Sequence, residues 1–211
     1  KNEFRAVWIA TVANIDWPKS NIDPVEKQKE DYIEILDTYK KMNYNAVIVQ
    51  IRSSGEAFYP TELAPWSRFL TGKEGKAPSP YFDPLEWMIT QAHARGFEFH
   101  AWLNPYRATM DTKTENLSPN HDFNKNRNWM IKYGGKYYYN PALPEVQTHL
   151  IDVSPVGRLL KQAYRRVQHL GGRWMSQQAG THNLSALGGE VQLHHVGFNP
   201  NILDWRNGNR R

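Results

Sequence analysis

An alternation of strand-like and helix-like segments restricts this chain to a small set of folds. Three runs are predominantly apolar: residues 4–12 (FRAVWIATV), 46–51 (AVIVQI) and 97–103 (FEFHAWL). Such runs suit strands that are buried on both faces, as in parallel sheets. Because helix-like segments separate them, the order predicts parallel β/α crossovers, in either a barrel or an open doubly wound sheet.

Two similar start signals open the helix-like segments. Residues 23–26 (DPVE) and 83–86 (DPLE) each offer Asp as N-cap, Pro at the first helical position and Glu at the third. The first helix is predicted to end near Asn43 and the second at Gly96. Farther along, we expect a helix over 120–130, a short strand at 137–139 and a helix that starts within 140–144.

The loops differ at the two ends of the predicted strands. Helix-to-strand links are short, whereas the links after the second and third strands are long, polar and aromatic, which is typical of the functional face of a barrel. No glycine-rich phosphate turn follows any strand, which disfavours a dinucleotide-binding sheet. The polar residues at the strand exits are Gln50, Arg52, His100, Asn104, Tyr106 and Arg107.

Composition excludes several kinds of site. The chain has no cysteine, so it can form no disulfide and no thiolate metal site. His93 and His100 fall on different predicted elements and His194 and His195 are adjacent, so we expect no metal and no cofactor. No apolar run approaches the roughly 20 residues of a membrane span. No signal peptide precedes Lys1, although a targeting segment could have been removed.

Charge is distributed unevenly along the chain. Residues 1–153 hold 18 Lys and Arg against 19 Asp and Glu, whereas residues 154–211 hold 8 against 2, a net charge of +6. A basic segment could bind nucleic acid, but its most basic stretch, 161–166, has only Tyr164 as an aromatic residue. We therefore expect no nucleic-acid partner.

Four ordered motifs resemble one known family. They are residues 5–18 (RAVWIATVANIDWP), 45–72 (NAVIVQIRSSGEAFYPTELAPWSRFLTG), 81–107 (YFDPLEWMITQAHARGFEFHAWLNPYR) and 133–146 (YGGKYYYNPALPEV). Together they resemble the bacterial glycosyl-hydrolase-like family ten over residues 4–153. The resemblance implies an α/β fold, a partial (β/α)8 TIM-type barrel made of the first three to four β/α units.

The resemblance ends after residue 153. The family continues into a fourth strand with an acidic motif, and nothing in residues 154–211 is similar to it. We interpret this segment as the product of a shifted reading frame or a truncation, with a real divergent tail as the alternative. The predicted organisation is residues 1–153 as the N-terminal half of a barrel and residues 154–211 as a basic tail of uncertain fold.

The resemblance also implies a function and a location. It implies hydrolysis of glycosidic bonds in a bacterial polysaccharide, and peptidoglycan glycan strands are a candidate substrate because one branch of the family is implicated in cleaving them. Members are often exported or lipid-anchored, so we expect a periplasmic, cell-envelope or extracellular location. Hydrolysis usually needs two carboxyl groups that flank the bond. The remaining loop carboxylates, Asp16, Glu56 and Glu62, are more typical of loop structure, so we assign no catalytic residue.

Substrate-binding residues are easier to propose. Asn104 follows a buried strand and can both donate and accept hydrogen bonds to sugar hydroxyls, although it could instead cap a turn. Arg52 could pair with Glu56 or with an acidic sugar substituent. The full set of expected substrate-binding residues is Arg52, Asn104, Tyr106, Arg107, Trp17, Trp66, Glu56 and His100.

Aromatic residues make up 13% of the chain, and their positions suggest different roles. Trp17 and Trp66 lie on predicted loops and could stack against sugars, whereas Trp8 and Trp102 lie inside strands and are expected in the core. His100 alternates with apolar neighbours and is expected to point into the barrel. Two other functional interpretations stay open: a carbohydrate-binding remnant without catalysis, and a non-functional product that folds poorly.

Overall fold

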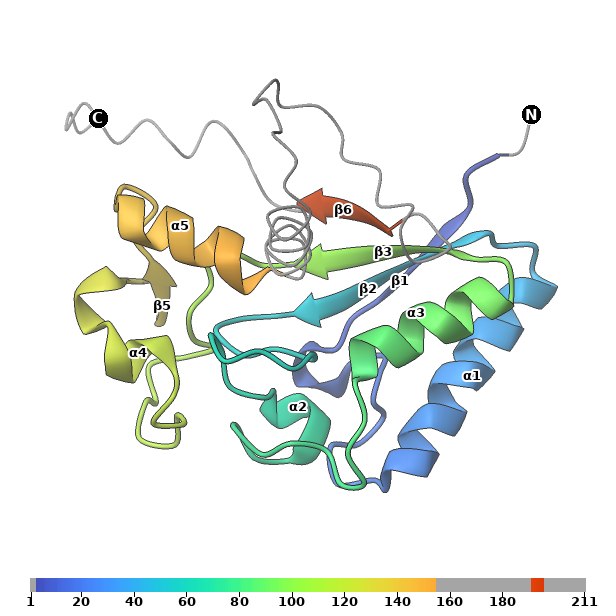
Figure 1. The fold of residues 1–211 in the computed structure, drawn as a ribbon, viewed down its shortest axis with the longest axis horizontal. Coiled ribbons are helices and arrows are strands. Elements are labelled where there is room, and N and C mark those ends of the chain that lie inside the picture. Colours follow the sequence, from blue (N-terminus) through green and yellow to red (C-terminus); the bar gives the residue numbers. More distant parts are fainter. Residues whose placement is uncertain (1–2, 155–190, 196–211) are drawn as a thin grey trace, which may run out of the picture.

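A computed structural model describes residues 3–154 and residues 191–195 of the chain (Figure 1). Its central sheet contains β1 (Ala6–Ile9), β2 (Ala46–Arg52), β3 (Glu98–Leu103) and β6 (Val191–His195), in that spatial order. All neighbouring strands in this sheet are parallel, which confirms the predicted β/α architecture. The predicted basic tail, residues 154–211, lies outside the described residues except for residue 154 and residues 191–195, so its fold stays a prediction.

Helices α1 (Val25–Lys41) and α3 (Pro84–Ala94) cover one face of this sheet (Figure 1). The start of α3 is as predicted, since Asp83 Oδ1 accepts hydrogen bonds from the backbone N–H groups of Leu85 and Glu86. The prediction for α1 was wrong by one residue. Pro24 takes an extended conformation with ψ of 149° and occupies the N-cap position itself, so the helix begins at Val25.

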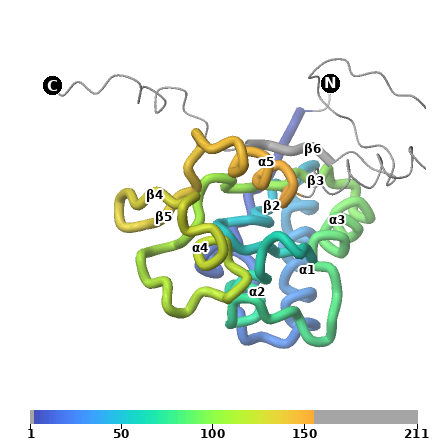
Figure 2. Tube along the Cα trace, turned by 60° about the vertical axis from the view of Figure 1, so that its left-hand side comes forward, coloured from blue at the N-terminus to red at the C-terminus, as the bar shows by residue number. Residues whose placement is uncertain are grey.

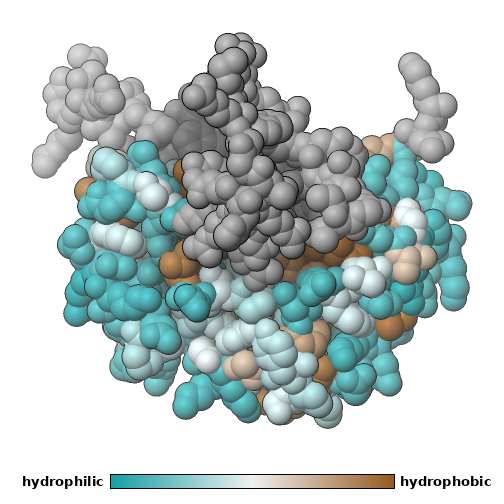
Figure 3. Space-filling model, viewed as in Figure 1, coloured by the Kyte–Doolittle hydropathy of each residue, from teal (hydrophilic) through white to brown (hydrophobic). Residues whose placement is uncertain are grey.

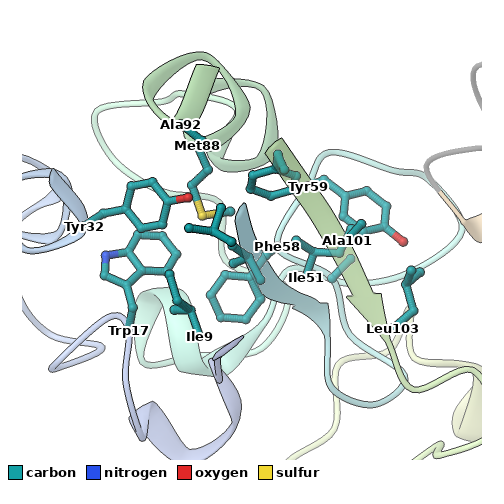
Figure 4. Packing of buried hydrophobic residues seen from close by; sticks show 14 of the residues in the cluster. Ile9, Trp17, Tyr32, Ile51, Phe58, Tyr59, Met88, Ala92, Ala101 and Leu103 are labelled. Carbon is teal, nitrogen blue, oxygen red and sulfur yellow. The ribbon is translucent and has the colours of Figure 1, made fainter. Parts of the chain in front are cut away.

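The main hydrophobic core lies between the sheet and these helices (Figure 4). Residues at alternate strand positions point into it, among them Ile9 of β1, Ile51 of β2 and Leu103 of β3. Because side chains alternate across a sheet, Trp8 and Trp102 point to the opposite face. The prediction that both belong to the core was therefore wrong: Trp8 is 45% exposed and Trp102 is half-buried.

Residues 104–153 form a group of small elements near the carboxyl ends of β2 and β3 (Figure 2). The group contains α4 (Asp122–Lys125), a 3₁₀ turn (Arg127–Trp129), β4 (Met130–Tyr133), β5 (Lys136–Tyr139) and α5 (Pro144–Val153). The predicted strand at 137–139 and the helix that starts within 140–144 are confirmed.

The predicted helix over 120–130 was wrong. Asn126, with φ of −135° and ψ of 55°, interrupts it after one turn, and Met130 already pairs with Tyr139 in an antiparallel hairpin. Gly134 and Gly135 turn this hairpin with φ of 54° and 75°, the geometry that two-residue hairpin turns require. The tertiary contact with the hairpin therefore overrides a weak local helix signal.

The surface of the described part is mostly hydrophilic in the view of Figure 3, with hydrophobic residues in small areas. Two further short helical elements, Val12–Asn14 and α2 (Arg68–Thr71), lie in the loops after β1 and β2. Within the described ranges, no helix is long and apolar enough to cross a membrane.

Candidate functional site

The exits of β2 and β3 meet at one edge of the sheet. The backbone N–H of Asn104 donates to the carbonyl of Arg52 at 2.9 Å, and Asn104 Nδ2 donates to the carbonyl of Ser53 at 3.1 Å. Arg52 and Asn104, two of the predicted strand-exit residues, thus lie together at this edge of the sheet, which we call the rim. Asn104 joins the two strands where both end.

Asn104 also orients an indole ring at this rim. Trp102 Nε1 donates to Asn104 Oδ1 at 2.9 Å, and the ring of Trp102 meets that of Trp8 edge to face, with 5.1 Å between centroids. Both rings lie on the sheet face that α1 and α3 leave uncovered. The edge-to-face contact and the hydrogen bond together preorganise an aromatic surface next to an amide.

Arg52 lies buried at the end of β2, with 1% of its surface exposed. Its Nη2 donates to Tyr139 Oη at 3.5 Å, whereas Nε and Nη1 have no partner among the described residues. Of the two partners considered for Arg52, Glu56 is engaged elsewhere, because it accepts from Arg68 through its backbone N–H at 3.0 Å and its Nε at 3.3 Å.

A buried carboxylate network adjoins Arg52. Tyr139 Oη donates to Asp122 Oδ2 at 2.7 Å, and His149 Nε2 lies 2.7 Å from the same oxygen. Burial alone raises the pKa of Asp122, but the contacts with His149 and Tyr139 outweigh it and hold this pKa below its ordinary value. Burial raises the pKa of Tyr139, so its hydroxyl stays protonated and keeps donating to Asp122.

A second carboxylate cluster holds the long loop after β2. Arg68 contacts both Glu56 and Glu74, and Glu74 Oε1 accepts a hydrogen bond from the backbone N–H of Ser118 at 2.9 Å. Burial, followed by the charge of Glu56, raises the pKa of Glu74 to about 7. The cluster thus ties the loop after β2 to the loop after β3, and Glu56 acts there in loop structure.

Glu74 gives this cluster a measurable pH dependence. Because its pKa is about 7 in the fold and near 4.5 in the unfolded chain, its stabilising contribution is complete below pH 4.5 and is lost as the pH rises through 7. The difference in free energy of unfolding between Glu74→Gln and the parent chain should therefore shift in favour of the variant by on the order of 2 kcal/mol from pH 5 to pH 8. Urea unfolding of both proteins at the two pH values measures this.

Comparing the variant with the parent chain separates the effect of Glu74 from that of His121, whose titration changes stability in the opposite direction. Burial lowers the pKa of His121 to about 4, so His121 makes the fold more stable as the pH rises from 4 towards 6.5. Since His121 is present in both proteins, its contribution cancels in the difference. An equal difference in stability at pH 5 and pH 8 would contradict the assignment to Glu74.

The two tryptophans that were expected to stack against sugars, Trp17 and Trp66, differ in how exposed they are. Trp17 is fully buried beside Tyr32, and its Nε1 donates to the carbonyl of Gln28 at 2.7 Å, so its placement as an accessible loop ring was wrong. Trp66 is half-buried and meets the exposed ring of Tyr81 edge to face at 6.4 Å. Of the two, only Trp66 keeps a surface that a sugar could reach.

The remaining predicted residues take supporting positions. His100 is buried on the sheet face opposite α1 and α3, with its ring 5.4 Å from that of Phe4. Tyr106 packs into a small second core, and Arg107 pairs through its backbone with Tyr138. Asp16 and Glu62 are exposed, and Asp16 Oδ2 accepts from the backbone N–H of Ala10, which fits a loop-structuring role.

Sequence reasoning missed Asp122, His149 and Glu74. The local signal was weak, because the N-cap of α4 is His121, and His is not among the preferred N-cap residues. Its Nδ1 accepts from the backbone N–H of Phe123 at 3.0 Å. Within the described ranges, no group of three His, Asp or Glu side chains is arranged to hold a metal.

Comparison with known proteins gives the family. The model of the family described as Glycosyl hydrolase-like 10 matches residues 3–158. Glycosyl hydrolase YngK of Bacillus subtilis is 49% identical over 150 residues, a match that covers 71% of this chain and 29% of YngK. Glycosyl hydrolase DigH of Escherichia coli K12 is 34% identical over 166 residues, covering 71% of this chain and 37% of DigH.

Among solved structures, the GH36 alpha-galactosidase AgaB of Geobacillus stearothermophilus aligns with a TM-score of 0.43 and 15% identity, covering 76% of this chain and 20% of that protein. The chain spans less than two fifths of the length of YngK or DigH. The family match itself covers well over half of this chain and includes both strand exits described above. The chain belongs to the glycosyl hydrolase-like 10 family.

Proposed function

We propose that this chain acts in the hydrolysis of glycosidic bonds of a bacterial polysaccharide, with peptidoglycan glycan strands as the substrate. The family match over residues 3–158 carries this proposal. The names of YngK and DigH as glycosyl hydrolases support it. With such a substrate, we also propose that the protein works outside the cytoplasm, in the periplasm, the cell envelope or the extracellular space.

The rim at β2 and β3 supports a sugar-binding role. Trp102 offers a half-buried apolar ring, and the side-chain amide of Asn104 lies beside it. Sugars present both apolar C–H faces and hydroxyl groups, so an aromatic ring next to an amide matches their chemistry. We therefore assign Trp102 and Asn104 to substrate binding, with Asn104 acting partly by positioning the indole.

A second candidate function is carbohydrate binding without turnover. Its supporting observation is that the buried carboxylates near the rim already have partners: Glu56 accepts from Arg68, and Asp122 contacts Tyr139 and His149. Neither is poised in the structure as one of the two carboxyls that flank a scissile bond. The described residues thus account for binding better than for proton transfer.

One experiment separates the two functions. The chain is incubated with peptidoglycan glycan strands from which the peptides have been removed, and both strand affinity and release of reducing ends are measured. Binding with release supports hydrolysis, binding without release supports the second candidate, and no binding contradicts both. A sharp thermal transition confirms that the protein tested is folded, whereas a broad one points to a chain that folds poorly.

Variants at the rim sharpen this test. Trp102→Ala should weaken strand affinity about tenfold, since it removes the ring face. Asn104→Ala and Trp66→Ala should each weaken it less. The matched control is Trp87→Ala, because Trp87 lies on α3 and packs against Tyr32 and Phe82 in the helix layer. If the control lowers affinity as much as Trp102→Ala, the rim is not the binding site.

A further inference from the structure

A cavity of about 310 Å³ lies between the start of α1, the end of α2 and the loop that follows α2. Its volume is at the small end of the range for ligand sites in proteins. In Figures 1 and 2, α2 lies beside the first turns of α1, and Gln28 Nε2 joins the two helices by donating to the carbonyl of Leu70 at 2.9 Å. Residues 21–25, 70–71 and 76–79 thus enclose one space.

Part of the cavity wall is apolar. Val25, Leu70 and Pro78 line the cavity, and all three side chains are buried. They come from α1, α2 and the following loop, so the fold rather than the local sequence brings them together. This wall favours an apolar group of modest size.

Two further residues of the lining offer hydrogen-bond acceptors. Gln28 is 3% exposed, and its Nε2 donates to the carbonyls of Asp23 at 3.1 Å and Leu70, which fixes the amide. Gln28 Oε1 is left without a donor among the described residues. The carboxylate of Asp23 takes part in no ion pair in the described part of the chain. A buried acceptor without a partner is unfavourable, so these oxygens favour a ligand that donates hydrogen bonds.

The same cavity also presents donors and positive charge. Pro24 and Val25 line it, and Pro24 is the N-cap of α1 without a side chain that could accept from the first N–H groups of the helix. A helix start of this kind favours a negative charge. Lys76 lines the cavity as well, and within residues 3–154 and 191–195 its ammonium group forms no ion pair.

We propose that this cavity binds a small zwitterion, namely an α-amino acid with a short apolar side chain. Its ammonium group faces Asp23 and Gln28 Oε1, its carboxylate faces Lys76 and the start of α1, and its side chain lies on the apolar wall. A simple anion would meet the like charge of Asp23, and a simple cation would meet that of Lys76. A molecule that carries both charges satisfies the two groups at once. The site is independent of the proposed glycan function.

L-Valine and two of its derivatives provide the first test. The full chain is titrated with valine, with valinamide, which lacks the carboxylate, and with N-acetylvaline, which lacks the ammonium group. Binding is followed by the NMR shifts of backbone amides. Valine should bind at least about tenfold tighter than either derivative and shift the amides of residues 21–28 and 70–79. No saturable shift with valine, or equal affinity for either derivative, would overturn the site.

Two variants assign the charged contacts. Lys76→Gln should remove the advantage of valine over valinamide, because the carboxylate loses its partner. Asp23→Asn should remove the advantage of valine over N-acetylvaline, because the ammonium group loses its partner. The matched controls are Lys73→Gln and Glu26→Gln, which change the net charge equally. Both residues are exposed, neither lines the cavity, and Glu26 pairs with Lys29.

The variants separate a specific contact from a general effect. Each variant should lose one advantage and keep the other, whereas a distorted cavity would lose both. Retention of both advantages in Lys76→Gln and in Asp23→Asn would contradict the proposal. Equal losses in the two controls would show that overall charge causes the preference and would overturn the site. If Asp23→Asn does not fold, Lys76→Gln and the three ligands on the parent chain decide the outcome.

Discussion

Gly55→Ala is expected to lower the free energy of unfolding by about 2 to 4 kcal/mol. A Cβ atom at Gly55 would lie 2.4 Å from His121 Nε2 and 2.8 Å from the carbonyl oxygen of Ala108. Those two groups also contact each other, at 3.1 Å, and the Gly55 N–H donates to the same carbonyl at 3.0 Å. The added methyl would have to separate the loop after β2 from the loop after β3. Urea unfolding of the variant and the parent measures the loss.

Gly134→Ala is the matched control for this prediction. Gly134 has φ of 54° and no heavy atom within 4 Å of an added Cβ, so its substitution meets backbone strain without a clash. A loss of about 1 to 2 kcal/mol is expected from the left-handed conformation alone. A loss at Gly55 no larger than at Gly134 would mean that the two loops do not approach each other as closely as the structure shows.

Trp17→Phe is expected to destabilise the fold by about 1 to 3 kcal/mol, and Trp17→Ala by about 3 to 5 kcal/mol. The indole of Trp17 is fully buried, with ring centroids 5.5 Å from Tyr32 and 6.1 Å from Phe58. Phenylalanine loses the hydrogen bond from Nε1 to the Gln28 carbonyl, and alanine leaves a cavity as well. Chemical unfolding gives the stability of each variant.

The same variants decide whether Trp17 binds sugar. Since no face of its ring is accessible, Trp17→Phe should leave glycan affinity unchanged in the folded protein. Trp8→Phe is the matched control, because Trp8 is 45% exposed and should lose far less stability. A Trp17→Phe variant that keeps its stability but binds glycan more weakly would restore the role expected from the sequence.

The elements that sequence patterns predicted correctly are those whose signals are local. Three predominantly apolar runs indicated the parallel strands β1, β2 and β3, and the Asp-Pro pair at residues 83–84 indicated the start of α3. Strand β6 was not predicted, and the hairpin of β4 and β5 was recognised only at its second strand. Both depend on pairing with a distant segment, which leaves a weak trace in the local sequence.

In the candidate site, too, the sequence predicted the feature that depends on strand order but not the contacts between side chains. The meeting of Arg52 and Asn104 followed from the order of the strands, because parallel strands bring their carboxyl ends to one edge. The partners of the side chains did not follow from it. Glu56, four residues from Arg52, pairs instead with Arg68, and Arg52 contacts Tyr139, which lies 87 residues away in the chain.

The amino-acid order alone was enough to establish the architecture, the polar strand exits and the resemblance to a glycosidase family. Only the folded structure decided which tryptophan is buried and which is exposed, since Trp17 fills the core while Trp8, inside a strand, lies on the sheet face opposite α1 and α3. Hydrophobic pattern and capping act over a few residues, so they can be read along the chain. Burial and charge pairing depend on the side chains that the fold brings together from distant segments.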